Sequence, residues 1–517
     1  MKPQNCQQEK VFAPARQKFN SLCQDLESAS MLAMTHSEVE LWLQIEGAKL
    51  LQELYQDHLN LRSITEIKAE SVEGADGIRR TPQRIARRLL MTVFGPVTVS
   101  RLRYASPGQC SLCPMDSELN LPLVKYSYGL QRILAAEVAR SSFDEALTAL
   151  NRYCAGHIPK RQAEEVVCQA SCDFDAFYAQ LSYASAEEKS VAVSLQILSL
   201  DAKGIVMLPE DLRESTQKAA QSHKLSKRSS RGEKKNRKRM ATVAAVYSQA
   251  PYPQTPSQVA RGCYPQDEKT ARPKPIGKRV WASVEKEVRT VVDEIFTEAT
   301  RQDPNKERQW VALVDGNKDQ IRHLKTAARQ QQVKLSIVLD VIHVLEYLWK
   351  AAYVFYPEGS LAAQDWVTEQ FFRILQGKSS RVAGAMRRKA TRTELSQEAR
   401  RNVDKCAQYL LNNKPYLRYH VFLNAGYPIA TGVIEGACRY LVKDRMDRTG
   451  ARWSLKGAEA VLKLRALLTC GDFDAYWTFH EQQQKLRHYA SVRKILSVPC
   501  RPCRKVEKSH EYLHEAS

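Results

Sequence analysis

The sequence predicts a multi-domain α+β protein, with a mostly helical N-terminal region, a mixed α/β core, and a helical insertion before the last core segment. Apolar residues recur at helical spacing in residues 1–75 and 127–180. From about residue 190, short runs of aliphatic and β-branched residues alternate with helical patterns, which is typical of a mixed sheet with helices. The length of 517 residues allows about two to four such domains.

The charge balance indicates a polyanionic partner. The chain has 78 Lys and Arg against 57 Asp and Glu, a net charge of +21. Nucleic acid is the first candidate, and an anionic membrane surface is the rival. No stretch approaches the roughly 18 apolar residues of a spanning helix, and Met1 to Lys10 is too polar for a signal peptide. We therefore expect a cytoplasmic, nucleoid-associated protein without a membrane partner.

The 13 cysteines lie mostly in apolar helical contexts, so we expect reduced thiols and no disulfides. Two C-x-x-C pairs occur, Cys110/Cys113 and Cys500/Cys503. Together they supply the ligands of a four-thiolate zinc site, but they lie at opposite ends of the chain. We therefore do not expect zinc.

The N-terminal region, residues 1–186, is expected to begin with helices. Val39, Leu43 and Leu54 belong to the helical pattern. Further on, Arg87 to Phe94 and Val97 to Tyr104 alternate apolar with basic or polar residues around Gly95-Pro96. This pattern predicts two short strands joined by a turn.

A helix-turn-helix is the DNA-binding element that we predict near residues 142–172. Ser142 and Glu145 have capping-box spacing and open a helix that runs to about Ala155. After a turn at Gly156, Pro159 suits the first position of a second helix. That helix presents basic and amide side chains at its start, where a recognition helix reads the major groove: Lys160, Arg161 and Gln162. An ordinary helical hairpin has the same pattern.

Four strands are expected in the core, at Val191 to Leu200, Met240 to Tyr247, Trp310 to Val314 and Lys334 to Leu339. Residues 250–278 read as an irregular connector, and Val280 to Thr300 as a helix. Three of the strands are expected to end on an aspartate, at Asp201, Asp315 and Asp340. An aspartate at a strand end is also typical of a helix cap or a turn.

The run from Lys224 to Arg239 has nine Lys or Arg and one Glu. Because it emerges beside Asp201, we expect it to contact a phosphate backbone, although such a run is also typical of a solvated loop. The residues assigned to this contact are Lys227, Arg228, Lys234, Lys235, Arg237, Lys238 and Arg239.

The segment from Gly432 to Trp453 has a carboxylate, Glu435, at the start of an expected helix whose next turns are strongly basic. Glu435, Arg439 and Lys443 follow one another at intervals of four, so a regular helix places them near one face. Arg448 lies further along. An acid beside cations suits the binding of a metal and a phosphate together. The alternative is a solvated ladder of i, i+4 charges.

Aspartates gathered at the carboxyl edge of a sheet, joined by Glu435, can hold two hard divalent cations about 3.5–4 Å apart. This arrangement drives in-line phosphoryl displacement. Because Mg²⁺ prefers oxygen ligands, the expected cofactor is Mg²⁺ or Mn²⁺, with two ions.

Several short motifs resemble DDE transposases of bacterial insertion sequences, most closely the ISKra type. They are Leu200-Asp-Ala-Lys-Gly204, Arg237-Lys-Arg-Met-Ala241, Val314-Asp-Gly316, and Gly432-Val-Ile-Glu-Gly436 with Lys443 downstream. The resemblance runs from about Ser194 to Leu468. It implies an RNase H-like catalytic core with Asp201, Asp315 and Glu435 as the catalytic and metal-binding triad. Ala202 departs from the pattern, where Gly is expected.

The expected division of the core is a first part at residues 190–355, a helical insertion at 356–427, a completing part at 428–480 and a basic tail at 481–517. The insertion explains why the stretch between Asp315 and Glu435 is too long for a minimal core. Related transposases carry a C/D-x-x-H motif that Asp340-Val-Ile-His343 resembles, although His343 also fits a helix-packing role.

The resulting hypothesis is a transposase that cleaves and joins strands of double-stranded DNA, at its element's ends and at the target, acting as at least a dimer. A nuclease of the same fold and a non-catalytic DNA-binding relative are the alternatives.

Overall fold

The structure is a computed structural model that describes residues 11–181, 194–222, 237–261, 272–448, 450–489 and 493–495. None of the helices in these ranges has the length and the apolar character needed to cross a membrane. Contacts group the described residues into two compact units. The first contains residues 11–130, 151–157, 481–489 and 493–495, and the second contains residues 131–150 and the described part of 158–480.

The contacts do not divide the chain at residue 186, where we predicted the end of the N-terminal region. Helix α6 (Tyr128–Arg140) ends against two arginines from the C-terminal part of the chain. Arg445 Nε donates to the carbonyl oxygen of Val138 at 2.9 Å, and Arg465 donates to that of Ala139. The last carbonyls of a helix lack partners within it, so these arginines join α6 to the core.

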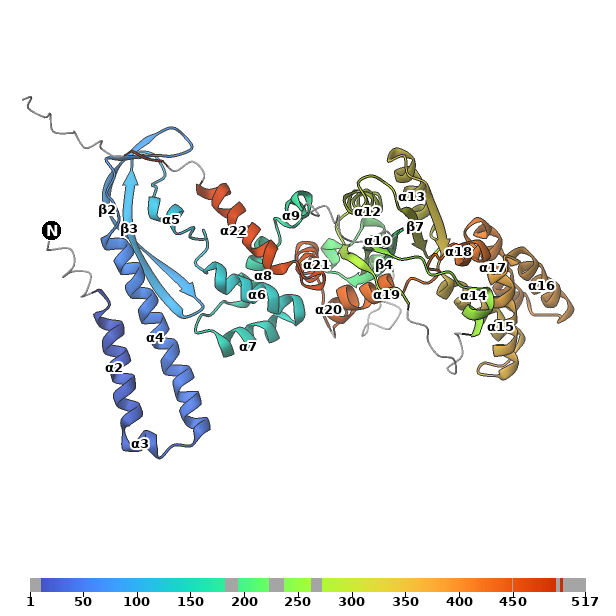
Figure 1. Cartoon of the computed structure of the whole chain (residues 1–517), viewed down its shortest axis with the longest axis horizontal. Coiled ribbons are helices and arrows are strands. Elements are labelled where there is room, and N and C mark those ends of the chain that lie inside the picture. Colours follow the sequence, from blue (N-terminus) through green and yellow to red (C-terminus); the bar gives the residue numbers. More distant parts are fainter. Residues whose placement is uncertain are drawn as a thin grey trace, which may run out of the picture. The chain divides into compact units, whose positions relative to one another are not determined.

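The first unit begins with the helices that the sequence predicted. Figure 1 shows α2 (Ala13–Glu27) and α4 (His36–Ile64) side by side, joined through α3 (Ala29–Leu32). Helix α4 opens with a capping box, in which Thr35 N donates to the Glu38 carboxylate at 2.8 Å.

An antiparallel sheet follows, in the order β3-β2-β1-β9. Its long hairpin, β2 (Arg79–Thr92) and β3 (Gly95–Ala105), confirms the two predicted strands and extends the first of them toward its N-terminus. The short strands β1 (Ser71–Glu73) and β9 (Arg493–Ile495) were not predicted. Three residues are too few to show an alternating pattern. A short helix, α5 (Pro114–Glu118), follows the hairpin.

The second unit continues from α6 with α7 (Phe143–Tyr153), α8 (Lys160–Ala170) and α9 (Phe174–Gln180). The predicted capping box is present, because Ser142 N donates to the Glu145 carboxylate and Glu145 N donates to Ser142 Oγ. Helix α8 packs on α21 (Leu455–Cys470), a helix from the C-terminal part of the chain.

The core of this unit is a five-stranded mixed sheet in the order β6-β5-β4-β7-β8. Strand β5 is antiparallel to both of its neighbours, β6 and β4, whereas β4, β7 and β8 are parallel to one another. The strands are β4 (Leu195–Val206), β5 (Lys238–Gln249), β6 (Ile276–Ser283), β7 (Gln309–Val314) and β8 (Leu335–Leu339).

Strand β6 corrects two predictions, the irregular connector up to residue 278 and the helix starting at Val280. Helix α12 (Val288–Gln302) begins only after the strand. The apolar spacing of Val280 and Val284 imitates a helical turn. However, Val280, Val284 and the residues between them are all buried. Pairing with β5 holds the backbone as far as Ser283, and Val284 N donates to the Glu459 carboxylate at 2.9 Å.

Helices cover both faces of the sheet, since every residue of β5 from Ala241 to Gln249 is buried. Helix α12 packs on β4 and β5, α13 (Lys318–Gln330) packs on β7, and α21 packs on β6. Smaller elements in the connections are η1 (Pro209–Asp211), α10 (Glu214–Ser222) and α11 (Pro256–Arg261).

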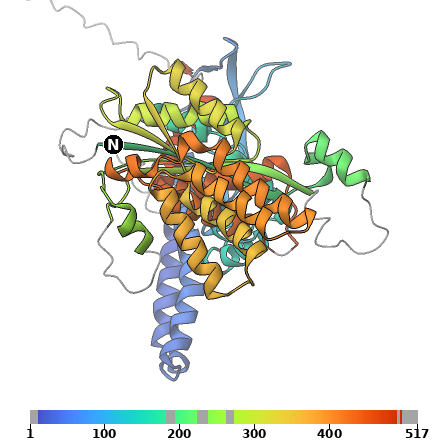
Figure 2. The same cartoon turned by 90° about the vertical axis from the view of Figure 1, so that its right-hand side faces the viewer.

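The block between β8 and Glu435 is helical, as predicted for residues 356–427. Figure 2 shows its yellow and orange helices grouped together; α14 packs on α15 and α17, and α17 on α16. They are α14 (Val341–Phe355), α15 (Leu361–Leu375), α16 (Ser379–Arg392), α17 (Gln397–Asn412), η3 (Lys414–Tyr416) and α18 (Tyr419–Asn424).

The segment after this block is not the regular helix that the sequence predicted. Helix α19 (Gly432–Ala437) continues into a π-helical stretch, η4 (Cys438–Lys443), before α20 (Asp444–Met446). The wider turns change the spacing of side chains, so the expected i, i+4 face does not hold. Helix α21 and the part of α22 (Phe473–Tyr489) up to His480 complete the unit, and the rest of α22 belongs to the predicted tail.

Candidate functional site

Three aspartates lie at one edge of the parallel strands. The pairing register of β4 with β7 and of β7 with β8, extended by one or two residues, places Asp201, Asp315 and Asp340 at the same level on adjacent strands. Asp340 N donates to the carbonyl oxygen of Val314 at 2.8 Å, which holds the ends of β7 and β8 together.

Asp201 does not end its strand as predicted. Strand β4 continues to Val206 and keeps its pairing with β5, whereas its pairing with β7 stops at Ser199. The edge at Asp201 therefore forms because β7 leaves the sheet. Further along β4, a Cβ atom at Gly204 would lie 2.9 Å from the side chain of Lys238, so glycine permits this close approach.

The Asp201 carboxylate is held by two hydrogen bonds. Ala202 N donates to Oδ1 at 2.6 Å, and Cys438 Sγ donates to Oδ2 at 3.2 Å. Burial and the charge of Asp201 raise the pKa of the Cys438 thiol, so it remains a protonated donor at neutral pH. The sequence analysis missed Cys438. Its position three residues after Glu435, on the same side of a helix, was the available signal.

Asp315 lies in the turn between β7 and α13. Its Oδ1 accepts from Asn317 N at 2.8 Å, and Asn317 in turn caps α13 through its side chain. The hydroxyl of Tyr409, from the helical insertion, donates to the backbone carbonyl of Asp315 at 3.1 Å. Gly316 has φ of +97°, a conformation that favours glycine in this turn.

Asp340 has a structural role that its position at the edge did not indicate. Its side chain is fully buried, and Oδ1 caps α14 by accepting from Ile342 N at 3.0 Å. Its other oxygen accepts a hydrogen bond from the Thr431 hydroxyl, at the start of α19. Asp340 therefore joins the end of β8 to the helix that carries Glu435.

Glu435 is exposed on α19, which packs on β4 and β5. Partial burial raises the pKa of its carboxyl group above the usual 4.5, and the charges of Asp340 and Asp201 raise it further. The half-buried His343 lies close enough to lower it. Because Thr431 at the start of α19 is bonded to Asp340 and α19 packs on β4, the helix that carries Glu435 lies beside the edge that carries the aspartates.

The donor set at this edge fits hard divalent cations. Asp201, Asp315 and Glu435 offer carboxylate oxygens, and the negative charges of Asp340 and Asp201, which add to the effect of burial on the pKa of Glu435, are charge that a cation would offset. In the described part of the chain, only Cys172, Asp173 and His480 bring three potential metal-ligand atoms of His, Cys, Asp or Glu within 4.8 Å of one another. The three acids therefore stand further apart than that.

The cluster of Cys172, Asp173 and His480 is held by its own hydrogen bonds. The buried Asp173 Oδ2 is bonded to His480 Nδ1 at 2.7 Å and accepts from the Cys172 thiol at 3.4 Å. These bonds tie α22 to the turn before α9. Of the two C-x-x-C pairs, Cys110 and Cys113 are described as free thiols. Cys500 and Cys503 lie outside the described residues.

The basic run predicted to contact DNA is described only at its end. Lys227, Arg228, Lys234 and Lys235 lie outside the described residues. Arg237 and Lys238 are half-buried where β5 begins. Arg239 donates to the carbonyl oxygens of Val284 and Asp211, at 2.9 and 3.3 Å, so its guanidinium has a structural role.

The other predicted cations are exposed, and three of them make ion pairs: Arg439 with Asp444 at 3.8 Å, Lys160 with Asp144 at 2.8 Å, and Arg448 with Glu145. A hollow of about 870 Å³ is lined by residues from early and late segments of the second unit's sequence, including Lys160, Arg161 and Arg448. Lys443 is exposed and lies two turns beyond Glu435. Gln162 is half-buried.

Comparison with protein-family models and with curated proteins finds no match for this chain.

The raised pKa of Glu435 predicts a pH-dependent stability. A carboxyl group whose folded-state pKa is raised stabilises the fold below its unfolded pKa of about 4.5, and this contribution is lost as pH rises through the folded-state value. Glu435→Gln keeps the neutral form at every pH. Without divalent cations, its melting temperature should exceed that of the wild type at neutral pH, and the difference should shrink below pH 5 or so.

Added Mg²⁺ should raise the melting temperature of the wild type more than that of Glu435→Gln, because the variant lacks one carboxylate ligand. Asp319→Asn, at an exposed position on α13, is the control and should respond to Mg²⁺ as the wild type does. Equal Mg²⁺ responses of the wild type and Glu435→Gln would remove Glu435 from the cation site.

Proposed function

We propose that the chain is a DNA transposase with an RNase H-like core and the catalytic acids Asp201, Asp315 and Glu435. The observation that carries the proposal is the arrival of these acids, far apart in the sequence, at one edge of a mixed sheet. Three antiparallel strands followed by two parallel ones, in the order β6-β5-β4-β7-β8, is the arrangement expected of an RNase H-like core. The helices before Glu435 fit the insertion that the resemblance to ISKra-type DDE transposases implies.

In this proposal Asp201, Asp315 and Glu435 would hold the divalent cations. Mg²⁺ or Mn²⁺, when bound, supplies Lewis-acid activation of the attacking hydroxyl and stabilises charge on the leaving oxygen. Cys438 orients the Asp201 carboxylate, and Asp340 positions α19 through Thr431. Arg439 and Lys443 extend into solvent beyond Glu435, where they hold the phosphates of the DNA.

The proposed partner is double-stranded DNA, consistent with the net charge of +21. Joining two element ends to a target requires at least two active sites on one DNA complex, so we propose a dimer or larger oligomer on DNA.

Three outcomes of one assay separate the candidate functions. The purified chain is incubated with Mg²⁺ and a DNA that carries the inverted repeats flanking its reading frame, with a plasmid as target. Cleavage followed by joining supports a transposase. Cleavage without joining indicates a nuclease of the same fold, and DNA binding without either reaction indicates a non-catalytic relative.

Helix α8 is the proposed reader of the element's ends. Arg161 is exposed at its start, followed by Gln162; Arg and Gln can read guanine and adenine through paired hydrogen bonds, each worth about 1–3 kcal/mol of discrimination. The double variant Arg161→Ala/Gln162→Ala should lose about 30-fold or more of the preference for end DNA over random duplex. Arg152→Ala, an exposed position on α7, is the control. An undiminished preference in the double variant would make α7 and α8 a structural hairpin.

A further inference from the structure

A row of cations lies along one face of α13. Lys318, Arg322, Lys325 and Arg329 follow one another at intervals of four, three and four residues, so they share a face of the helix. All four are exposed, whereas Ile321 and the other apolar residues of α13 are buried against the sheet. The four cations span about 16 Å along the helix axis.

Three hollows adjoin this row and share residues with one another. One of about 460 Å³ lies between α13, the edge strand β8 and the segment from η3 to α18. A second, of about 320 Å³, shares Lys325, Arg329 and Tyr416 with it, and a third of the same size shares Pro415 and Arg418. The shared residues place the three hollows next to one another, and together they are called the basic groove below.

The groove is positively charged throughout. No Asp or Glu is among the described residues that line the three hollows. The cations of the groove come from α13 and from the opposite wall, and they are Lys318, Arg322, Lys325, Arg329, Lys414 and Arg418. Of these six, only Arg322 makes an ion pair in the described part of the chain, with Asp319 at 3.1 Å. So many uncompensated cations indicate a polyanionic ligand.

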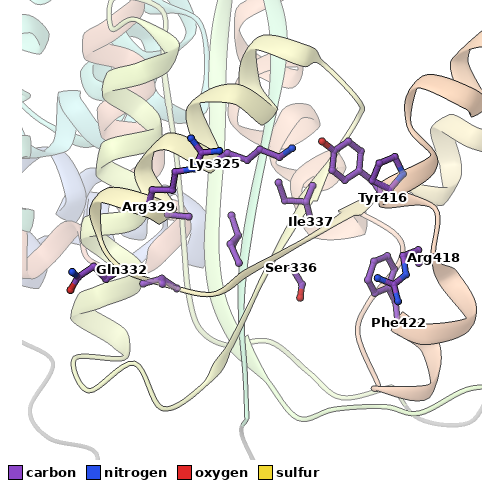
Figure 3. A pocket seen from close by; sticks show the side chains of 12 residues that line it. Lys325, Arg329, Gln332, Ser336, Ile337, Tyr416, Arg418 and Phe422 are labelled. Carbon is purple, nitrogen blue, oxygen red and sulfur yellow. The ribbon is translucent and has the colours of Figure 1, made fainter.

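The lining also contains aromatic rings. Figure 3 shows Lys325 extending toward Tyr416, and Arg418 beside Phe422, on the wall opposite α13. Lys325 Nζ lies 5.2 Å from the centre of the Tyr416 ring. Tyr416 is only half-buried, so part of its ring is available to a sugar or a base.

One end of the groove reaches the acidic edge. Asn317, whose backbone N–H contacts the Asp315 carboxylate, caps the end of α13 at which Lys318 lies. We propose that this basic groove binds the sugar-phosphate backbone of a DNA strand that leads to or from the acidic edge. One strand of duplex DNA presents a phosphate every 3.4 Å of axis, so the row on α13 faces about five phosphates.

The groove is a contact of the proposed transposase that the sequence analysis did not find. Its identification as a DNA site rests on the proposed function, whereas its charge and shape do not. The test therefore measures binding alone, with the full chain, a short duplex of random sequence and no divalent cation. Affinities are compared between about 50 and 200 mM salt.

The test variant is Lys325→Gln/Arg329→Gln/Lys414→Gln/Arg418→Gln. Each phosphate contact contributes about 0.9 to the slope of log affinity against log salt, so this slope should fall by about 2–4. The control variant neutralises four exposed cations outside the groove, with the same change in net charge: Arg289, Arg392, Arg401 and Lys405. Its slope should stay close to that of the wild type.

An unchanged slope in the test variant, or an equal fall in both variants, would overturn the proposal. Melting temperatures show whether each variant is folded. If the test variant has lost its fold, Arg418→Gln and Lys414→Gln, which are exposed single changes, replace it and should each lower the slope by about 0.9. If the slope of log affinity against log salt falls as expected in the test variant but the wild type cleaves no DNA strand, the proposed groove stands and only the proposed catalysis is rejected. Tighter binding of a single strand than of the duplex would assign the groove to unpaired DNA.

Discussion

Replacing Asp201, Asp315 or Glu435 singly with Ala is expected to lower Mg²⁺-dependent strand cleavage and joining by about three orders of magnitude, because a lost metal ligand removes several kcal/mol of transition-state stabilisation. Affinity for end DNA should persist, since the cations that contact phosphate are unchanged. Single-turnover strand transfer on end DNA, with a parallel binding measurement, tests this. Wild-type activity in any one variant would exclude that residue from the site.

Two further aspartates serve as controls. Asp319 is exposed on α13 and paired with Arg322, so Asp319→Ala should retain activity. Asp340→Ala should lose about 1–3 kcal/mol of stability, because α14 loses its cap and the buried Thr431 hydroxyl loses its acceptor. Asp340→Asn keeps an oxygen that accepts from Ile342 N, and its amide N–H can donate to the Thr431 hydroxyl oxygen, so it should keep most of the activity. A loss as large as that in the triad variants, with an unchanged melting temperature, would make Asp340 a metal ligand.

Glu298→Ala is expected to destabilise the second unit by about 3–5 kcal/mol, because it leaves a buried cation without its partner. Glu298 is fully buried on α12, and its carboxylate accepts from Arg279 of β6 at 2.6 Å and from Arg301 at 2.7 Å. Arg279 itself lies between two aromatic rings, with its guanidinium 3.7 Å from the centre of Tyr178 and 4.5 Å from that of Trp281. Water therefore has little access to the arginine once the carboxylate is gone.

Chemical denaturation of the full chain measures this loss as a shift of the transition that reports on the second unit. Glu294→Ala is a matched control on the same helix, because its carboxylate is only half-buried and bonds to Lys286 and to the Trp281 ring N–H. It should cost about 1–2 kcal/mol, as expected for hydrogen bonds at a partly solvated site. A Glu298→Ala loss no larger than this control would show that Arg279 is satisfied without Glu298.

Local patterns in the sequence were sufficient for much of the fold. The capping box at Ser142 and Glu145, the helices of residues 356–427 and the strands before Asp315 and Asp340 all formed where expected. Each depends on neighbours within one or two turns or on a continuous apolar run. Such signals are present in a short window of sequence.

Two of the wrong predictions involve pairing between distant segments. Strand β6 was taken for the start of a helix, because apolar spacing near Val280 fits a helical turn and only β5 provides the partner that makes it a strand. The end of β4 was placed at Asp201, although β5 continues to pair with it as far as Val206. A third wrong prediction is local: the regular helix expected after Glu435 contains a π-helical stretch.

The sequence by itself determined which residues are candidates: the acids after two predicted strands, the acid at Glu435, and a strong excess of cations. Only the tertiary structure decided which of them meet. Strand register placed Asp201 level with Asp315, the contact between Asp340 and Thr431 positioned Glu435, and Cys438 reached Asp201. The facing wall of the basic groove on α13 comes from residues 414–422. These are contacts between residues tens to hundreds of positions apart, and no local pattern specifies them, because their free energy depends on packing that exists only in the folded chain.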